Sequence, residues 1–324
     1  MSAHGMSSEG LIVNYLMRNT DRPVSLTELS KALKLPPQLI FMKLKELMRR
    51  GFILEGDERV GYQLICEDDL RLAGIYLQDI STKYHFDICF LEKVTSTQDI
   101  AKELMREQEI HSILVIAEEQ SRGRGRLDRR WISTPGGIWM TFALRIRLQG
   151  VKIPILGMTG AVSVAKAIEN ITSLNAKVKW PNDVLVNGRK VCGILIEASL
   201  SDAEALICMG IGLNVNNDIP KDLVPSATSL KAILKKPVPR LWLLRAILLQ
   251  LCPRIPIVIE DPSNILDEWR KLSSTLRKRV KVVLHERTII GKAVDIADDG
   301  SLILLTSEGL KKIAVGDIVH LRDT

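Results

Sequence analysis

Gln-Ser-Arg-Gly-Arg-Gly-Arg-Leu-Asp-Arg-Arg-Trp, residues 120–131, is the stretch around which the rest of this sequence is organised. Five arginines lie within nine residues and are opposed by one acidic residue, Asp128, so the stretch cannot be a packed core element. Gly123 and Gly125 let the backbone approach a ligand closely, and guanidinium groups bind phosphate or carboxylate oxygens in pairs. The stretch predicts a mobile cationic loop with an anionic partner. A solvated basic loop is the alternative.

The chain as a whole has the composition of a globular protein. It has 324 residues, enough for two or three domains, with 46% hydrophobic and 26% charged residues. No apolar run approaches the ~20 residues of a membrane span, and the N-terminus lacks the order of a signal peptide. The five cysteines have no metal-ligand spacing, which predicts reduced, buried thiols. We expect a cytoplasmic protein that contacts no membrane.

Residues 1–66 have the pattern of a winged helix-turn-helix domain. Apolar spacing predicts three helices, and residues 52–54 and 60–64 bracket a polar turn as a hairpin does. In that motif the third helix enters the DNA major groove. The candidate DNA contacts on this helix are Lys43, Lys45, Arg49 and Arg50. Acidic residues nearly balance the basic ones, so a protein-interaction or dimerisation domain is the alternative. Residues 67–84 are a connector.

Residues 85–275 alternate strand and helix patterns and predict an α+β catalytic domain. The segment Lys179-Trp-Pro-Asn-Asp183 offers a cation and two oxygen-bearing side chains, although a simple Asx-type turn would also explain it. The dipeptide Asn187-Gly188 predicts a hairpin that sets Lys190 and Gly193 on its returning strand. The strand at 205–215 ends in Gly210-Ile-Gly-Leu-Asn214, where small residues leave room beside the sheet.

Several reaction classes are excluded by what the motifs lack. The sequence has no Gly-x-x-x-x-Gly-Lys-Ser/Thr phosphate loop, and the five histidines lie outside the motifs above. A kinase, a P-loop NTPase and a serine hydrolase are therefore excluded. Residues 276–324 carry five short strand patterns, at 280–284, 288–290, 293–296, 301–305 and near 313, which predict a small barrel.

The motifs together resemble the biotin protein ligase family. The resemblance rests on Gly123-Arg-Gly-Arg126 with Arg129 and Trp131, on residues 179–183, on Lys190 with residues 193–197, and on residues 210–214, in this order and at these separations. It runs from about residue 86 to the C-terminus. With the N-terminal pattern in front, the chain resembles the bifunctional subgroup that joins a biotin ligase to a biotin operon repressor. The resemblance implies a class II synthetase-like catalytic domain and an SH3-like C-terminal barrel.

The resemblance also implies an activity and its partners. Biotin and MgATP would form biotinyl-5′-AMP, which a lysine of a biotin carboxyl carrier protein then attacks. Operator DNA would be a second partner, bound by a homodimer loaded with biotinyl-AMP. The alternatives are a repressor that senses biotinyl-adenylate without ligating, and a related lipoate or octanoate transferase, against which the arginine loop argues.

Roles are implied position by position. The implied catalytic residues are Arg126, Lys190 and Asp183. Biotin-binding positions are Ser96, Thr97, Gln98, Gln120, Gly123, Arg124, Arg126, Trp131, Lys190 and Gly193, with Trp139 beside them. Nucleotide and phosphate positions are Arg126, Arg129, Lys179, Asn182, Asp183 and Asn214. No metal ligand is assigned for Mg²⁺.

Three positions depart from the family pattern. Gln98 stands where asparagine is usual, so its amide reaches further. Asp128 stands where glycine is common, which lowers the charge of the loop and restricts its backbone. Ala227 offers no aromatic face for stacking on adenine.

Overall fold

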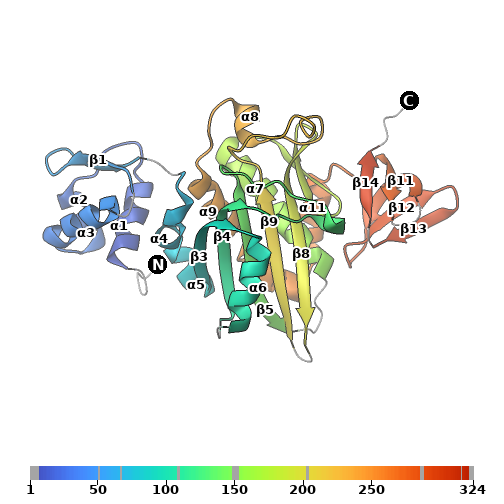
Figure 1. The fold of residues 1–324 in the computed structure, drawn as a ribbon, viewed down its shortest axis with the longest axis horizontal. Helices are drawn as coiled ribbons and strands as arrows, with labels where there is room; N and C mark the ends of the chain where they lie inside the picture. The colour runs from blue at the N-terminus through green and yellow to red at the C-terminus, as the bar shows by residue number, and fades with distance from the viewer. Residues whose placement is uncertain are drawn as a thin grey trace.

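A computed structural model describes residues 7–49, 52–65, 68–107, 110–147, 153–201, 204–284, 288–314 and 316–320. The fold is a mixed α+β architecture whose three parts lie in a row. An N-terminal helical unit stands at one end, a large sheet with helices lies in the middle, and a small β unit stands at the other end (Figure 1). The middle unit therefore lies between the N-terminal unit and the C-terminal unit.

The N-terminal unit contains three helices followed by a hairpin, as the sequence predicts. Its elements are α1 (Ser8–Met17), α2 (Leu26–Leu33), α3 (Pro37–Arg49), β1 (Leu54–Asp57) and β2 (Gly61–Leu64). Ser25 caps α2 by accepting a hydrogen bond from the Glu28 amide at 3.1 Å, which satisfies one of the free amides at the helix start. Ile12, Leu29 and Leu44 form its buried core.

The connector is helical. It contains η1 (Leu70–Leu72), α4 (Ala73–Tyr76) and α5 (Gln78–Tyr84). Its apolar residues Leu70, Tyr76 and Ile80 are buried in the same core that runs through the N-terminal unit and the middle sheet. The connector is therefore packed against its neighbours and is not a free linker.

The middle sheet has seven strands in the order β3-β4-β5-β9-β8-β7-β6. Only β3 and β4 pair in parallel, and the other pairs are antiparallel. The strands are β3 (Asp87–Val94), β4 (Ser112–Gln120), β5 (Ile138–Arg147), β6 (Ala176–Lys179), β7 (Asp183–Val186), β8 (Arg189–Leu200) and β9 (Glu204–Leu213). The predicted turn at Asn187-Gly188 joins β7 to β8, and both of its residues have positive φ.

The two faces of this sheet are covered differently. Helix α6 (Thr97–Glu107) covers part of one face, where Met105 packs with Val115 and Cys208. The other face carries the larger core, built with α7 (Ile153–Thr172), α9 (Arg240–Leu251) and α11 (Ser263–Leu272). The shorter helix α10 (Arg254–Glu260) packs against this layer, and α8 (Leu230–Leu234) is a further short helix.

One helical run, residues 240–260, is long and apolar enough to meet the length and composition criteria of a membrane span. The structure divides this run into α9 and α10, and Leu244 and Leu248 of α9 are fully buried against the middle sheet layer. The run also begins with Arg240, whose charged side chain is buried in ion pairs inside the protein. We describe it as a core helix pair.

The C-terminal unit is a five-stranded antiparallel sheet in the order β13-β12-β11-β10-β14. Its strands are β10 (Arg279–Val283), β11 (Thr288–Ile296), β12 (Leu302–Thr306), β13 (Gly309–Ile313) and β14 (Asp317–His320). The predicted strands at 288–290 and 293–296 are one strand. The pairing of this strand with β12 shifts register between Ala293 and Asp295. This irregularity lies within the second of the two segments that the sequence pattern had treated as separate strands. The fifth strand is β14, which the sequence pattern did not indicate.

Candidate functional site

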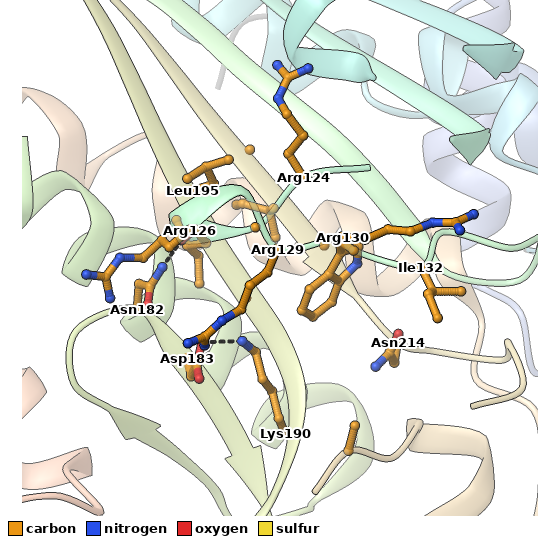
Figure 2. A pocket seen from close by; sticks show the side chains of 18 of the residues that line it. Arg124, Arg126, Arg129, Arg130, Ile132, Asn182, Asp183, Lys190, Leu195 and Asn214 are labelled. Atoms are coloured by element: carbon orange, nitrogen blue, oxygen red, sulfur yellow. Dashed lines mark hydrogen bonds and ion pairs between the residues drawn. The ribbon is translucent and has the colours of Figure 1, made fainter. Parts of the chain in front are cut away.

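A cavity of about 510 Å³ opens on the uncovered part of the sheet. The arginine loop lies over it, and the ends of β6, β7, β8 and β9 form its base together with residues at the start of β14. Figure 2 shows Arg126, Arg129 and Lys190 converging near Asp183 on one side of this cavity, and Asn214 on the other. The cavity therefore gathers cationic and amide groups from segments far apart in the chain.

Glycines on β9 make the room for this cavity. Along one face of the strand, Leu206 and Cys208 pack under α6, whereas Gly210 and Gly212 follow where the cavity begins. A Cβ on Gly210 would lie 2.8 Å from Nε2 of Gln98, and a Cβ on Gly212 would lie 2.5 Å from Nε1 of Trp131. The small residues that the sequence places at the end of this strand thus have a steric reason, because larger residues at 210 and 212 would displace Gln98 and Trp131.

Trp131 lies across the paired glycines of β8 and β9. Gly193 and Gly212 are register partners, and both approach the indole ring. The Lys190 ammonium lies 5.1 Å from the ring centroid, in the range of a cation–π contact. The indole Nε1 is buried and has no hydrogen-bond partner among the described residues. This nitrogen lies against Gly212, where an added Cβ would approach it to 2.5 Å.

The start of α6 and the end of β4 form the inner wall. The Gln120 amide oxygen accepts from the Thr97 backbone N–H at 2.8 Å and from its hydroxyl at 3.1 Å. The Gln120 amide nitrogen donates to Ser133 at 2.8 Å, and Ser96 lies beside it in the wall. Gln98 donates to the Leu195 carbonyl at 3.2 Å, while its own buried Oε1 has no hydrogen-bond partner among the described residues. The longer side chain at position 98 thus remains within the wall.

The arginine loop is folded back on itself. Gly125 N–H donates to the Arg129 carbonyl at 2.7 Å, and Trp131 N–H donates to the Gly123 carbonyl at 2.8 Å. A short turn, η2 (Arg126–Asp128), forms the tip, where Leu127 has a φ of 55° and is exposed. The side chain of Asp128 lies outside the described part of the structure.

Arg124 points away from Arg126, Arg129 and Lys190 (Figure 2). Its guanidinium makes two hydrogen bonds to the Asp99 carboxylate of α6, at 2.7 and 2.8 Å, and lies 3.5 Å from Glu197. The hydrogen bond from Arg124 lowers the pKa of Asp99 below its ordinary value. Arg124 therefore anchors the base of the loop to α6 and also lines the cavity.

Arg126 and Arg129 contact the C-terminal unit. Arg129 Nη2 lies 2.5 Å from Asp317 Oδ2, and Arg126 Nη1 lies 3.6 Å from Asp317 Oδ1. Arg126 also donates to the Gly316 carbonyl at 3.3 Å. Burial lowers the pKa of Arg126. An incoming anion would find these two cations already assembled beside one carboxylate.

The 179–183 segment supplies the other charged groups. Asp183 Oδ1 lies 2.6 Å from the Lys190 ammonium across the β7–β8 pair. Lys179 has no carboxylate within ion-pair distance among the described residues, and burial lowers its pKa. Asn182 is held by a hydrogen bond from its side chain to the Ile194 carbonyl. Lys179 is thus a cation without a fixed partner, facing the cavity.

Asn214 follows β9 and is buried. Its Oδ1 accepts a hydrogen bond from Nδ2 of Asn217 at 3.1 Å, which leaves the Asn214 amide nitrogen free to donate. Ala227 runs beside Lys190 as an isolated parallel bridge, so its backbone forms the nearby wall even though its side chain has no stacking face.

The cavity brings together most of the residues that the sequence implicated. Two do not line it: Gly123 packs against Trp131 and Ser133, and Trp139 is buried with its Nε1 donating to the Thr134 carbonyl. Among the lining residues that the sequence did not implicate are Asp317 and Asn217. Nothing local marks Asp317, which is separated from the arginine loop by nearly 190 residues. The run of asparagines at 214–217 was a visible signal for Asn217.

The candidate DNA-binding residues differ in whether their side chains are exposed or already paired with carboxylates. The Lys43 ammonium lies 2.5 Å from Glu9 and 3.0 Å from Glu46, so its charge is neutralised within the unit. Lys45 and Arg49 are exposed on α3. Arg50 lies outside the described residues.

Comparison with known families matches two parts of the chain. Residues 90–214 match the Biotin/lipoate A/B protein ligase family, and residues 275–321 match the Biotin protein ligase C terminal domain. The first match contains the inner wall, the arginine loop and Asn214, while the second contains Asp317.

Individual proteins agree with these matches. The Bifunctional ligase/repressor BirA of Bacillus subtilis is 33% identical, over 91% of this chain and 93% of that protein. Biotin--[acetyl-CoA-carboxylase] ligase of Mycobacterium tuberculosis is 31% identical over 66% of this chain and 81% of its own length. The structure of biotin protein ligase from Aquifex aeolicus in complex with biotin and ATP superposes with a TM-score of 0.63 at 31% identity, covering 73% of this chain and 99% of that one. The chain belongs to the biotin protein ligase family.

Proposed function

We propose that this protein is a biotin protein ligase that activates biotin with MgATP and transfers it to a carrier lysine. The observation that carries the proposal is the cavity, where Arg126, Arg129, Lys179 and Lys190 face one space beside a neutral, hydrogen-bonding wall. A relative in the same family was solved with biotin and ATP, and another is named as a biotin–acetyl-CoA-carboxylase ligase. The acceptor is a biotin carboxyl carrier protein.

In the first step, the biotin carboxylate attacks the α-phosphorus of ATP, and pyrophosphate leaves. Both reactants are anionic, so fixed cations that face the site lower the barrier by offsetting their repulsion. Arg126 and Lys190 are positioned beside the reacting groups, and Arg129 and Lys179 face the phosphates. Asn182, Asp183 and Asn214 bind polar groups of the nucleotide and the carboxyl.

In the second step, the amine of the carrier lysine attacks the carbonyl carbon of the mixed anhydride. AMP leaves with the electron pair of the broken C–O bond, and the amine loses a proton. Asp183 is the carboxylate nearest the Lys190 ammonium and is the candidate acceptor of that proton. The protein itself forms no covalent bond with biotin, which agrees with the lack of a histidine or serine nucleophile among the site motifs.

Biotin would occupy the inner wall. Ser96, Thr97, Gln98 and Gln120 offer hydroxyl and amide groups there, and Trp131 over Gly193 offers an apolar face. Gly123 and Arg124 act indirectly, because they shape and anchor the loop that covers this end.

The described residues fit a Mg²⁺ ion that arrives with the nucleotide. They contain no group of three or more His, Cys, Asp or Glu side chains that could hold a metal by themselves. Mg²⁺ in nucleotide sites is held by one or two carboxylates plus phosphate oxygens, and Asp183 and Asn182 supply oxygens of that kind. The ion would neutralise phosphate charge during the first step.

A second activity is biotin-responsive repression. The helices and hairpin of residues 1–66 are proposed to be a winged helix-turn-helix domain, joined by the 67–84 connector to the 85–275 catalytic domain and the SH3-like barrel at 276–324. Lys45 and Arg49 would contact operator phosphates, in a homodimer formed on loading with biotinyl-AMP. The B. subtilis relative, named a ligase/repressor, supports this reading. The protein acts in the cytoplasm.

Biotin-dependent ATP–pyrophosphate exchange tests the ligase proposal. The purified protein with biotin, ATP and Mg²⁺ should exchange labelled pyrophosphate into ATP, and octanoate or lipoate should not replace biotin. Exchange without transfer to a carrier domain would favour a non-ligating sensor of biotinyl-adenylate. Absence of biotin-dependent exchange refutes the ligase assignment.

A further inference from the structure

A buried arginine joins the connector to the floor of the cavity. The Arg240 side chain at the start of α9 is only 6% exposed, and it makes ion pairs with Asp68 and with Glu118 of β4. It also donates to the Asp68 carbonyl at 2.7 Å and to the Gly137 carbonyl at 3.1 Å. Asp68 lies just before η1, so Arg240 ties the connector to the sheet that carries the pocket.

The contacts continue from this ion cluster to Asn216. Glu118 accepts from the Gly136 N–H at 2.9 Å, and the Gly136 carbonyl accepts from the Asn216 N–H at 2.7 Å. The Asn216 side chain lies 3.4 Å from Asp68 Oδ2 and makes hydrogen bonds of 2.8 and 2.9 Å with the backbone of Val238. Gly136 has a φ of +98°, and a Cβ there would lie 2.9 Å from the backbone nitrogen of Asn217, so the two loops are closely packed. Asn216 is therefore held on both its backbone and its side chain.

The next residue reaches the ligand space. Asn217 is buried, lines the cavity, and donates to Oδ1 of Asn214 at 3.1 Å. Its own Oδ1 accepts from the Val215 N–H at 3.0 Å. Because the Asn217 amide is fixed at both ends, it determines which way the Asn214 amide faces.

We propose that Asp68 and Arg240 are positioning residues that act through Asn216 and Asn217 on the Asn214 amide, so that the Asp68–Arg240 contact sets the affinity for the adenylate. The proposal rests on the assignment of the cavity as the biotinyl-adenylate site. Neither Asp68 nor Arg240 lines the cavity, and their effect passes through the 214–217 turn. The connector thereby links the N-terminal unit to ligand binding by a named set of contacts.

The chain offers a matched control. Arg245 lies on the same helix and pairs with Asp79 of the same connector, through hydrogen bonds of 2.5 and 2.7 Å. This pair also fastens the connector to α9, but within the described part of the chain neither residue lines the cavity or makes a hydrogen bond or ion pair with residues 214–217. Asp79→Asn therefore weakens connector docking without touching the proposed route.

The test compares Asp68→Asn, Asp79→Asn, Asn217→Ala and the Asp68→Asn/Asn217→Ala double variant in the full chain. The affinity of a non-hydrolysable biotinyl-adenylate analogue is measured by calorimetry, beside the thermal unfolding midpoint. In Asp68→Asn the single amide oxygen cannot accept hydrogen bonds from both Arg240 and Asn216, as the two oxygens of Asp68 do. We therefore expect the analogue to bind about tenfold more weakly, which corresponds to the loss of roughly one charged hydrogen bond. Asp79→Asn should bind within about twofold of wild type.

The double variant decides the route. If Asp68 acts through Asn217, the double variant should bind no more weakly than the more severe single variant, because both changes interrupt one path. Multiplicative losses, or equal losses for Asp68→Asn and Asp79→Asn, would overturn the proposal. Failure of the wild-type protein to bind the analogue would instead refute the site assignment. Amide hydrogen exchange at residues 214–217 tests the same contacts without ligand. It should be faster in Asp68→Asn than in Asp79→Asn.

Discussion

Lys179 places a partly buried cation in the cavity without a fixed carboxylate partner. Burial disfavours its charged form, so its pKa lies below that of an ordinary lysine, and it loses its proton at lower pH than an exposed lysine would. If Lys179 binds nucleotide phosphate, the KM for ATP should rise on the alkaline side as this charge is lost.

The variant Lys179→Arg tests whether loss of this charge raises the KM for ATP, because a guanidinium remains charged over the whole pH range in which the enzyme can be assayed. Its KM for ATP in the exchange assay should stay flat where that of the wild type rises. Lys177→Arg, two residues earlier on β6, is the control and should keep the wild-type profile. An alkaline rise that persists unchanged in Lys179→Arg would assign it to another group.

Gly212 sets the position of Trp131. A Cβ at this residue would lie 2.5 Å from the indole Nε1, so Gly212→Ala must displace the ring. Overpacking of this kind costs roughly 1–3 kcal/mol, and we expect the KM for biotin to rise about tenfold or more. Gly157→Ala is the control, because its Cβ would meet only Ile196 at an ordinary 3.5 Å. An unchanged KM in Gly212→Ala would remove Trp131 from the biotin site.

At the scale of elements, the arginine loop has a fixed base and a tip held by ion pairs. Arg124 fastens the base to α6 through Asp99, whereas Arg126 and Arg129 meet Asp317 of β14. The tip contacts are charge pairs that phosphate groups can replace, so ligand binding exchanges one set of partners for another. The loop is therefore suited to closing over a carboxylate and a phosphate, which would exclude water from a hydrolysable anhydride.

Amide hydrogen exchange across residues 121–130 measures this closure. We expect rapid exchange without ligand and strong protection with biotinyl-adenylate bound, because closure orders the loop. Asp99→Asn should lower the protection and raise the rate at which adenylate is hydrolysed before transfer, since Arg124 loses its bidentate partner. Equal protection in both states of the wild type would contradict a lid. Residues 205–208 of β9, which lie outside the cavity, serve as the internal reference.

At the scale of the whole molecule, the cavity is built from the middle sheet and the C-terminal unit. Its first lining residue along the chain is Ser96, and Asp317 and Ile318 come from β14. The N-terminal unit contributes no lining residue among those described, and its exposed basic side chains Lys45 and Arg49 lie on α3. Ligation and DNA binding are thus assigned to different parts of the chain.

Removal of residues 1–64 separates these activities. The shortened protein keeps Asp68 with its Arg240 contact, so biotin-dependent pyrophosphate exchange should persist. Binding to an operator fragment should be lost in an electrophoretic shift assay, and binding by the full chain should fall steeply with salt because phosphate contacts dominate. Lys45→Ala in the full chain is the milder companion variant. Operator binding by the shortened protein would refute the assignment to this unit.

The sequence by itself determined the features that depend on neighbouring residues. Apolar spacing and the Ser25 cap specify the N-terminal helices, Asn187-Gly188 specifies the β7–β8 turn, and the Gly210/Gly212 alternation specifies an open strand face. These signals act over a few residues, where backbone preference and side-chain period are sufficient. The family motifs then indicated most of the cavity residues, because the chemistry of each motif is carried by its own side chains.

The tertiary structure alone decided which charges meet. Arg124 lines the cavity while Asp99 on α6 holds its guanidinium, and Asp317 enters the site from the far end of the chain. The proposed path from Asp68 through Arg240 to Asn217 likewise joins segments that are far apart in the sequence. Ion pairing depends on distances in space, which local sequence does not encode. Packing of the sheet, the connector and the C-terminal unit sets those distances.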